Sequence, residues 1–462
     1  FDDASALAHE GLAAATATEH APVLARAHLE LALVEAELGH EAAALAHATD
    51  AHFIATGTQQ HGLAATAATV ASDALPAESA SRSVALLWHR AGTAAALRMH
   101  DGERALADVD IAYGTSLLRL QEMDDAAEAL ARGTAILRRR LGADAQEVWQ
   151  AELMLARALV TGGRVDDAKA LVEHAIAQVE PQLGDDPPRL ATALASISEL
   201  HQFTGDMDAA ERAGARALAL LDANLGADHP IAIDTRVNYA ALLHRRRERE
   251  RAAELLAQAV ASCERIDDGP RRARSLHIQA IVLKQLKRYD EALAAETASS
   301  AWYRTHTPDA PRNLLLGALT IGNIQLLRDD YPAAEQSYRE AIALVEQHGL
   351  VDREEAVYSD FANFLFQTGR ATEAVGRWEA LLAHMRAKDA ARYDLAQYEF
   401  DLGRALWREG RDRERARAVV TAALAVLRSD PPTAQVGGHI RRDWTADELA
   451  KWLADPDAWE RD

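Results

Sequence analysis

Small apolar residues recur along this chain at a regular spacing, between longer apolar and charged segments. One alanine returns every 40–42 residues, and most copies stand five residues after a glycine or a polar residue. A second small residue usually follows seven residues later, and a third lies seven residues before the glycine or polar position. The recurring alanines are Ala4, Ala44, Ala85, Ala126, Ala168, Ala210, Ala252, Ala292, Ala334, Ala374 and Ala416. Because a fixed period of this length is typical of repeat proteins, the pattern predicts a repeated structural unit.

Each unit is predicted to be two helices joined by a short turn. The segments 163–168 (GRVDDA), 205–210 (GDMDAA) and 287–292 (KRYDEA) have similar sequences. Glycine readily adopts the positive φ that often ends a helix, and exposed polar residues tolerate such turns. The turn positions are Gly39, Gln121, Gly163, Gly205, Arg247, Lys287, Asp329 and Gly369. Small residues on both helices would then allow the pair to approach closely, with larger apolar residues between them.

Composition supports a helical array and fits a reducing compartment, although a chain without paired thiols is also allowed elsewhere. The 462 residues exceed the size of one compact core, and the apolar content relies on small and aliphatic residues, since aromatics are only 5%. The net charge of −21 disfavours nucleic acid and anionic membranes as general partners. Cys263 is the single cysteine, so no intramolecular disulfide can form, and no apolar run reaches the roughly 18 residues that span a bilayer. We therefore expect a cytoplasmic location.

The repeat pattern resembles the tetratricopeptide repeat (TPR) family over nearly the whole chain. Its spacing is longer than the usual 34 residues and is similar to the repeats of kinesin light chains, whose connectors read LG-x-x-HP. The segment 225–230 (LGADHP) has this form, and shorter versions occur at 183–184 and 141–142. HEAT and armadillo repeats have a similar length but do not place these alanines around a glycine or polar turn. The resemblance implies an all-α superhelix (a TPR solenoid) of about ten helix pairs, with an orphan N-terminal helix and a short C-terminal cap.

Five segments follow from this register. Residues 1–20 are predicted to be the second helix of a repeat whose first helix lies upstream in the natural polypeptide, because Phe1 falls two residues past a turn position. The other boundaries are 21–107 for weak repeats, 108–430 for regular repeats, 431–444 for a linker and 445–462 for a capping helix. In the weak region Asp73 occupies a position that is otherwise small, so it should distort its helix pair or face outward.

The predicted cap begins with a capping-box pattern, Thr445 followed by Glu448. Three tryptophans, Trp444, Trp452 and Trp459, could cover the apolar face of the last repeat. A solenoid needs such a cover because each repeat buries its core only against its neighbours.

Catalytic motifs are absent from the sequence. It contains no HExxH, Walker-type, GxGxxG or GxSxG motif, and none of the catalytic motifs of kinases. The 18 histidines have no cysteine cluster beside them, and Cys263 is predicted to be an inert packing residue. The adjacent Asp166 and Asp167 suit the first turn of a helix. We therefore predict no catalytic, cofactor-binding or metal-binding residues.

The order of weak and regular repeats is similar to the C-terminal TPR region of bacterial serine/threonine protein kinases. The final pair, with 405–407 (ALW) and 413–418 (RERARA), and the terminal helix near 452–453 carry this resemblance. It implies a regulatory or recruitment region of a larger signalling protein with a kinase domain upstream. A free-standing TPR adaptor, or the sensor half of a transcriptional regulator or defence protein, would have the same helical groove.

The groove itself is predicted to lie on the first helices of the repeats. The candidate peptide-binding residues there are His244, Arg245, Arg274, His277, Lys284, Asn323, Asn363, Phe366, Gln367 and Arg404. We expect an acidic or phosphorylated segment to lie across residues 244–367, held by charge-assisted hydrogen bonds. The alternative is that these cations pair with neighbouring Asp and Glu residues on a solvated face.

A known TPR site clamps the C-terminal carboxylate of a peptide with a Lys/Asn/Arg set. The resemblance places Asn323 and Asn363 at its asparagine position, whereas Leu319 and Ser359 stand where it has lysine. This departure argues against that particular clamp.

Overall fold

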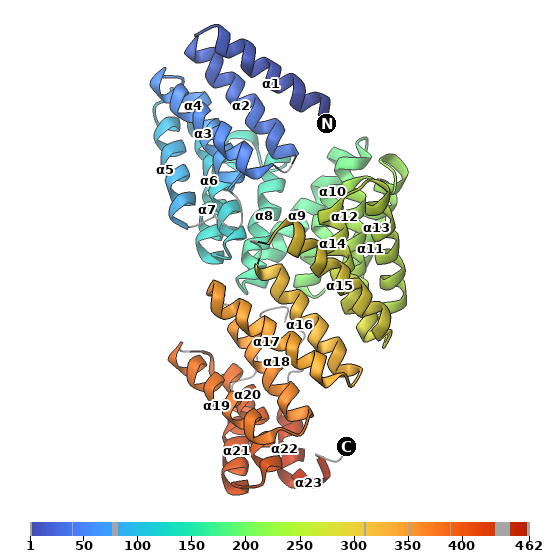
Figure 1. Ribbon diagram of the computed structural model, residues 1–462. Coiled ribbons are helices and arrows are strands. Elements are labelled where there is room, and N and C mark those ends of the chain that lie inside the picture. The colour runs from blue at the N-terminus through green and yellow to red at the C-terminus, as the bar shows by residue number, and fades with distance from the viewer. Residues whose placement is uncertain are drawn as a thin grey trace. The chain divides into compact units, whose positions relative to one another are not determined.

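The computed structural model describes residues 2–38, 40–75, 82–308, 311–350, 353–388, 390–429 and 444–459. Within these ranges the chain forms helices and no strands (Figure 1). It divides into two compact units, Phe1–Gly226 and Ala227–Asp462, called here the N-terminal and C-terminal units. The predicted turn position Gly39 and most of the predicted linker, 431–444, fall outside the described residues.

The N-terminal unit begins with a single helix, α1 (Asp2–Ala17), and continues with five helix pairs. The pairs are α2 (Ala21–Glu37) with α3 (Glu41–Gly57), α4 (His61–Asp73) with α5 (Arg82–Ala96), α6 (Glu103–Arg119) with α7 (Met123–Leu141), α8 (Gln146–Thr161) with α9 (Val165–Leu183), and α10 (Pro187–Thr204) with α11 (Met207–Asn224).

In the described part of the C-terminal unit there are five more pairs and two short helices. The pairs are α12 (Pro230–Arg245) with α13 (Arg249–Arg265), α14 (Gly269–Gln285) with α15 (Tyr289–His306), α16 (Pro311–Leu327) with α17 (Tyr331–His348), α18 (Glu354–Gln367) with α19 (Ala371–Ala387), and α20 (Arg392–Glu409) with α21 (Arg413–Ser429). The short helices α22 (Ala446–Ala454) and α23 (Pro456–Trp459) follow. The predicted ten pairs, orphan first helix and C-terminal cap are thus confirmed.

The turns within the pairs have the backbone conformation that their sequences predict. Positive φ angles occur at Gly163, Gly205 and Gly369, at 81–85°. Gln121, Arg247, Lys287 and Asp329 occupy the equivalent place with φ of 59–66°. A residue other than glycine can adopt this conformation at a modest energetic cost. The packing of the two flanking helices therefore imposes the turn even where glycine is absent.

The recurring alanines lie at the helix contacts. All ten whose side chains are described, from Ala44 to Ala416, have no solvent-exposed surface. Glycine serves the same purpose where helices approach most closely: a Cβ added at Gly114 would lie 2.5 Å from Cγ of Leu130, and one at Gly403 would overlap Val420. The repeat spacing therefore reflects the close packing of helix on helix.

The C-terminal cap covers the last repeat as predicted. Trp452 is fully buried, with its ring centroid 5.9 Å from that of Phe400 and 5.7 Å from that of Trp407. Thr445 and Glu448 form the predicted capping box at the start of α22. Gln397 of α20 holds the preceding residue by donating to the backbone carbonyl of Trp444 and accepting from its N–H, at 3.0 and 2.6 Å.

Candidate functional site

The first helices of successive pairs form a continuous layer within each unit. In the N-terminal unit α2, α4, α6, α8 and α10 contact one another in turn, and in the C-terminal unit α12, α14, α16 and α18 do the same. The second helices are in contact mainly with their own pair and with the next first helix. In a curved array of helix pairs, successive helices lie closer together on the concave side than on the convex side. The first helices, which contact one another, therefore form the inner face of each unit.

Four basic groups gather at one end of the inner face of the C-terminal unit. His244 ends α12, and the charges of Arg249, Lys284 and Arg245 all help to lower its pKa, after the larger effect of burial. We call these four residues the basic cluster. Among the described residues none of the four has a hydrogen-bond or ion-pair partner, and Nδ1 of His244 and Nε of Arg249 are buried without one. The cluster joins His244, Arg245 and Lys284, which sequence predicted, to Arg249, which it missed.

Lys284 occupies the most enclosed position of the cluster. Burial lowers the pKa of its amine, and the carboxylates of Asp360 and Glu296 act against this effect from a distance. Of the described residues, no carboxylate oxygen lies within 4.0 Å of its Nζ. A partly desolvated amine without a bonded partner would gain a charge-assisted hydrogen bond from a docked anion.

Three other predicted residues have partners within the protein. Arg274 donates to Asn238 at 3.1 Å and lies 3.5 Å from Asp234, and His277 bonds to the buried Glu296 at 2.8 Å. Asn323 donates to Asp360 at 3.2 Å and accepts from the hydroxyl of Tyr338 at 2.7 Å. Arg274 and Asn323 thus link successive repeats, and His277 links the two helices of one pair. For Arg274 and His277 this agrees with the alternative of locally paired cations.

The remaining predicted residues lie toward α18 and α20. Phe366 is buried beneath the guanidinium of Arg404, whose Cζ lies 4.8 Å from the ring centroid, and Arg404 also lies over Trp444 of the cap. Asn363 is half-buried and Gln367 is exposed, and neither side chain has a hydrogen-bond partner among the described residues. The two amides therefore lie free on α18, whereas Phe366 and Arg404 contribute to packing.

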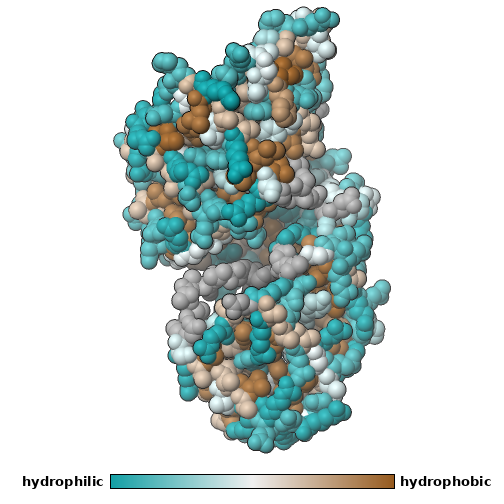
Figure 2. Space-filling model, turned by 90° about the vertical axis from the view of Figure 1, so that its left-hand side faces the viewer, coloured by the Kyte–Doolittle hydropathy of each residue, from teal (hydrophilic) through white to brown (hydrophobic). Residues whose placement is uncertain are grey.

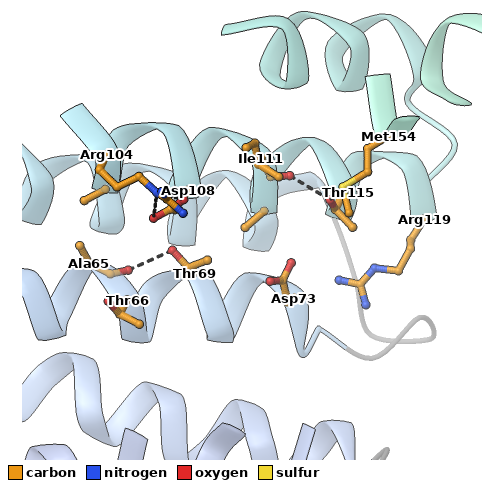
Figure 3. Close-up of a pocket in the computed structure, with 12 residues that line it drawn as sticks. Ala65, Thr66, Thr69, Asp73, Arg104, Asp108, Ile111, Thr115, Arg119 and Met154 are labelled. Atoms are coloured by element: carbon orange, nitrogen blue, oxygen red, sulfur yellow. Dashed lines mark hydrogen bonds and ion pairs between the residues drawn. The ribbon is translucent and has the colours of Figure 1, made fainter. Parts of the chain in front are cut away.

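A groove of about 570 Å³ lies on the inner face of the N-terminal unit, where sequence had indicated no site. Its floor is apolar, with Ala65 on α4, Ile111 and Ala112 on α6, and Met154 on α8. The polar residues at its wall include an ion pair in which Nε of Arg104 donates to Asp108 at 3.0 Å (Figure 3). The groove could hold an extended chain or an apolar side chain of a partner.

Asp73 and Arg119 extend toward each other at one end of this groove (Figure 3). Arg119 donates to the backbone carbonyls of Ser72 and Leu75, at 2.9 and 3.1 Å, and so binds the C-terminal end of α4. Asp73 is the last residue of that helix, faces the groove, and has no hydrogen-bond or ion-pair partner among the described residues. The expectation that Asp73 points away from its helix pair is therefore correct. Its side chain points into the groove.

The comparisons with known proteins agree with this architecture. Residues 149–223, which run from α8 to α11, match the sequence model of the tetratricopeptide repeat. These residues belong to the TPR family. No curated protein matches the sequence.

Several solved structures resemble the TPR array at low sequence identity. BtubC (BKLC) from P. vanneervenii is 17% identical, with 50% of this chain and 92% of that chain covered and a TM-score of 0.43. The apo form of RapI is 13% identical, with coverage of 84% and 99% and a TM-score of 0.48. Aspartyl phosphate phosphatase F from Bacillus subtilis is also 13% identical, with coverage of 78% and 92% and a TM-score of 0.48.

Cys263 and the pair Asp166 and Asp167 lie outside the two surfaces described above. Cys263 is fully buried, and burial raises the pKa of its thiol to about 11, which disfavours the reactive thiolate. Asp166 and Asp167 lie in the first turn of α9, as predicted.

On the face drawn in Figure 2 hydrophilic residues predominate and apolar residues form separate small areas. None of the described helices has the length and apolar character needed to cross a membrane.

The environment of Asp73 predicts a pH-dependent stability. Asp73 is exposed to the groove, but the helices around the groove partly shield its carboxylate from water and raise its pKa from 3.8 to about 6, although Arg119 opposes the shift. Between these two values the folded chain binds more protons than the unfolded chain, so the contribution of Asp73 to stability falls as pH rises through this range. We expect Asp73→Asn to raise the melting temperature at pH 8 and to have little effect at pH 4.

Thermal melts at both pH values test this prediction. Asp185→Asn, in the exposed connector before α10, is the matched control and should change the melting temperature equally at pH 4 and pH 8. An Asp73→Asn effect that does not vary with pH would contradict the proposed cause.

Proposed function

We propose that this chain is a protein-interaction scaffold whose C-terminal unit binds an acidic or phosphorylated segment on its inner face. The basic cluster is the observation that carries the proposal. On a chain with a net charge of −21, most cations can find a carboxylate nearby, as Arg274 and His277 do. The basic cluster lacks such partners among the described residues, which supports a role for it in holding an anion from outside.

The neighbouring groups suit an extended peptide. Asn363 and Gln367 offer free amides on α18, and an amide can both donate to and accept from a peptide backbone. TPR arrays commonly use such an inner face to hold a partner segment. The acidic groups of the segment would lie at the basic cluster and its backbone would continue toward α18.

Selection from a peptide library tests the preference for acidic ligands. We expect the purified chain to enrich peptides with Asp, Glu or phosphoserine over otherwise identical peptides with Gln or Ser, and the binding to weaken as salt is added. Enrichment of neutral or basic peptides would contradict the proposal.

Charge reversal tests the location of the site. Lys284→Glu together with Arg249→Glu removes two charge-assisted hydrogen bonds, each worth about 1.5–3 kcal/mol, so the selected peptide should bind at least about tenfold more weakly by fluorescence anisotropy. Lys287→Glu is the control for a single charge reversal outside the basic cluster, because Lys287 lies in the exposed turn after α14. Equal affinities for the two variants would place the site elsewhere.

We further propose that the scaffold is the regulatory or recruitment region of a larger signalling protein such as a serine/threonine kinase. The order of weak and regular repeats and the form of the terminal helix support this. The reading frame upstream of Phe1 provides the test. A kinase glycine-rich loop and HRD motif would agree with it, whereas a start codon there would indicate a free-standing adaptor, and a helix-turn-helix or nuclease domain a sensor.

A further inference from the structure

Two histidines and an aspartate meet on the first helix pair of the N-terminal unit. His28 lies on α2, and His47 and Asp50 lie one turn apart on α3. The Nδ1 atoms of the two imidazoles are 3.2 Å apart, and Oδ2 of Asp50 is 3.8 Å from Nδ1 of His28. All three ligand atoms lie within 4.8 Å of one another.

The three side chains have too few N–H donors to form hydrogen bonds with all of their acceptor atoms. Two neutral imidazoles facing each other through Nδ1 can share one hydrogen bond, and the carboxylate of Asp50, which only accepts, is too distant to form another with His28. When both imidazoles carry their proton on Nε2 instead, both Nδ1 atoms and the carboxylate oxygen are acceptors that lie close together with no hydrogen bond among them. A cation placed there would satisfy all three.

The geometry suits a first-row divalent metal ion. Tetrahedral zinc binds imidazole nitrogen at about 2.0–2.1 Å, which places two such ligand atoms about 3.3 Å apart, close to the distance between the two Nδ1 atoms. Asp50 must move inward slightly, and its side chain is 59% exposed and free to rotate. Imidazole and carboxylate together favour zinc, cobalt, nickel or copper over calcium or magnesium.

The surroundings allow the histidines to act as ligands and an ion to enter. The side chain of His28 is 14% exposed, so it lies at the inner end of the site. A neutral imidazole is the form that binds metal. His47 is half-buried and Asp50 exposed, so the site opens to solvent on one side.

We propose that the α2–α3 pair binds one divalent transition-metal ion, such as Zn²⁺, through Nδ1 of His28, Nδ1 of His47 and the carboxylate of Asp50. The remaining coordination position would hold water or a group from a partner. The fully buried residues of these two helices are mostly alanines, among them Ala25, Ala44, Ala48 and Ala51. A bound ion would therefore cross-link a helix pair with little large apolar packing of its own.

Titration of the tag-free, metal-stripped chain with Co²⁺ and Zn²⁺ tests this proposal. We expect saturation at one ion per chain by calorimetry, a visible absorption band for bound Co²⁺, and slower amide hydrogen exchange in α2 and α3 when Zn²⁺ is present. His28→Gln and His47→Gln should each weaken binding at least about tenfold.

Two further variants separate loss of metal binding from a change in folding. Asp50→Asn changes an exposed side chain, so it should weaken binding while the circular dichroism spectrum stays unchanged. His20→Gln, at an exposed histidine just before α2, should leave the affinity unaltered. Absence of saturable binding, or equal affinities for His20→Gln and His28→Gln, would show that the two imidazoles form only a hydrogen bond.

Discussion

Replacing Trp452 with alanine should destabilise the C-terminal end of the array by about 3–5 kcal/mol, the usual cost of removing a fully buried aromatic side chain. Trp452 has no exposed surface, and its indole packs edge-on against Phe400 and Trp407 of α20. Its loss would leave a cavity between α22 and the last pair. The cap would then cover that pair poorly, and a repeat array depends on its end caps because each repeat is buried only by its neighbours.

Urea unfolding and hydrogen exchange should locate this effect in α20, α21 and α22. Trp459→Ala is the matched control, since this tryptophan is only partly buried and should cost much less. If the two variants unfold at the same urea concentration, α22 does not act as the cap. Exchange rates that rise equally in the N-terminal unit would also contradict this prediction.

Leucine at Ala210 or Ala252 should cost about 1–3 kcal/mol through overpacking. Both alanines have no exposed surface and lie early in the second helix of a pair, on α11 and α13. Three additional carbon atoms at either position would force the paired helices apart. Because the two positions are equivalent in successive repeats, the two variants should behave alike in urea unfolding.

The controls for this prediction are exposed alanines on the same helices. Ala219→Leu on α11 and Ala257→Leu on α13 make the same chemical change at solvent-facing positions. Helix propensity alone changes little between alanine and leucine, so these variants should stay close to the parent protein. Losses of equal size at buried and exposed sites would mean that the repeat register is wrong.

The repeat register could be obtained from the sequence because its signals are local. The small residues, the turn residue and the alanine that follows lie within about twenty positions of one another, and each is required by helix geometry. The same holds for the capping box of Thr445 and Glu448, whose bonds span three residues. Cys263, which the sequence predicted to be a packing residue, is fully buried.

The residues of the candidate site could be predicted from the sequence only in part. Whether Arg274 is free or paired depends on Asp234 and Asn238, about one repeat earlier, and Asn323 depends on Asp360 in the same manner. The basic cluster includes Arg249 because the turn after α12 brings it beside His244. The spacing of residues along one helix does not show which side chains from other helices lie beside them.

By itself the sequence determined that this protein is an all-α TPR array with ten helix pairs and a tryptophan-rich cap, because close helix packing requires small residues at fixed intervals. Tertiary structure alone decided which polar side chains remain available for a ligand. Packing of the two helices in a pair sets the distance between His28 and His47, and stacking of one pair on the next sets the distance between Asp73 and Arg119. Those distances determine which charges are neutralised internally and which face the solvent.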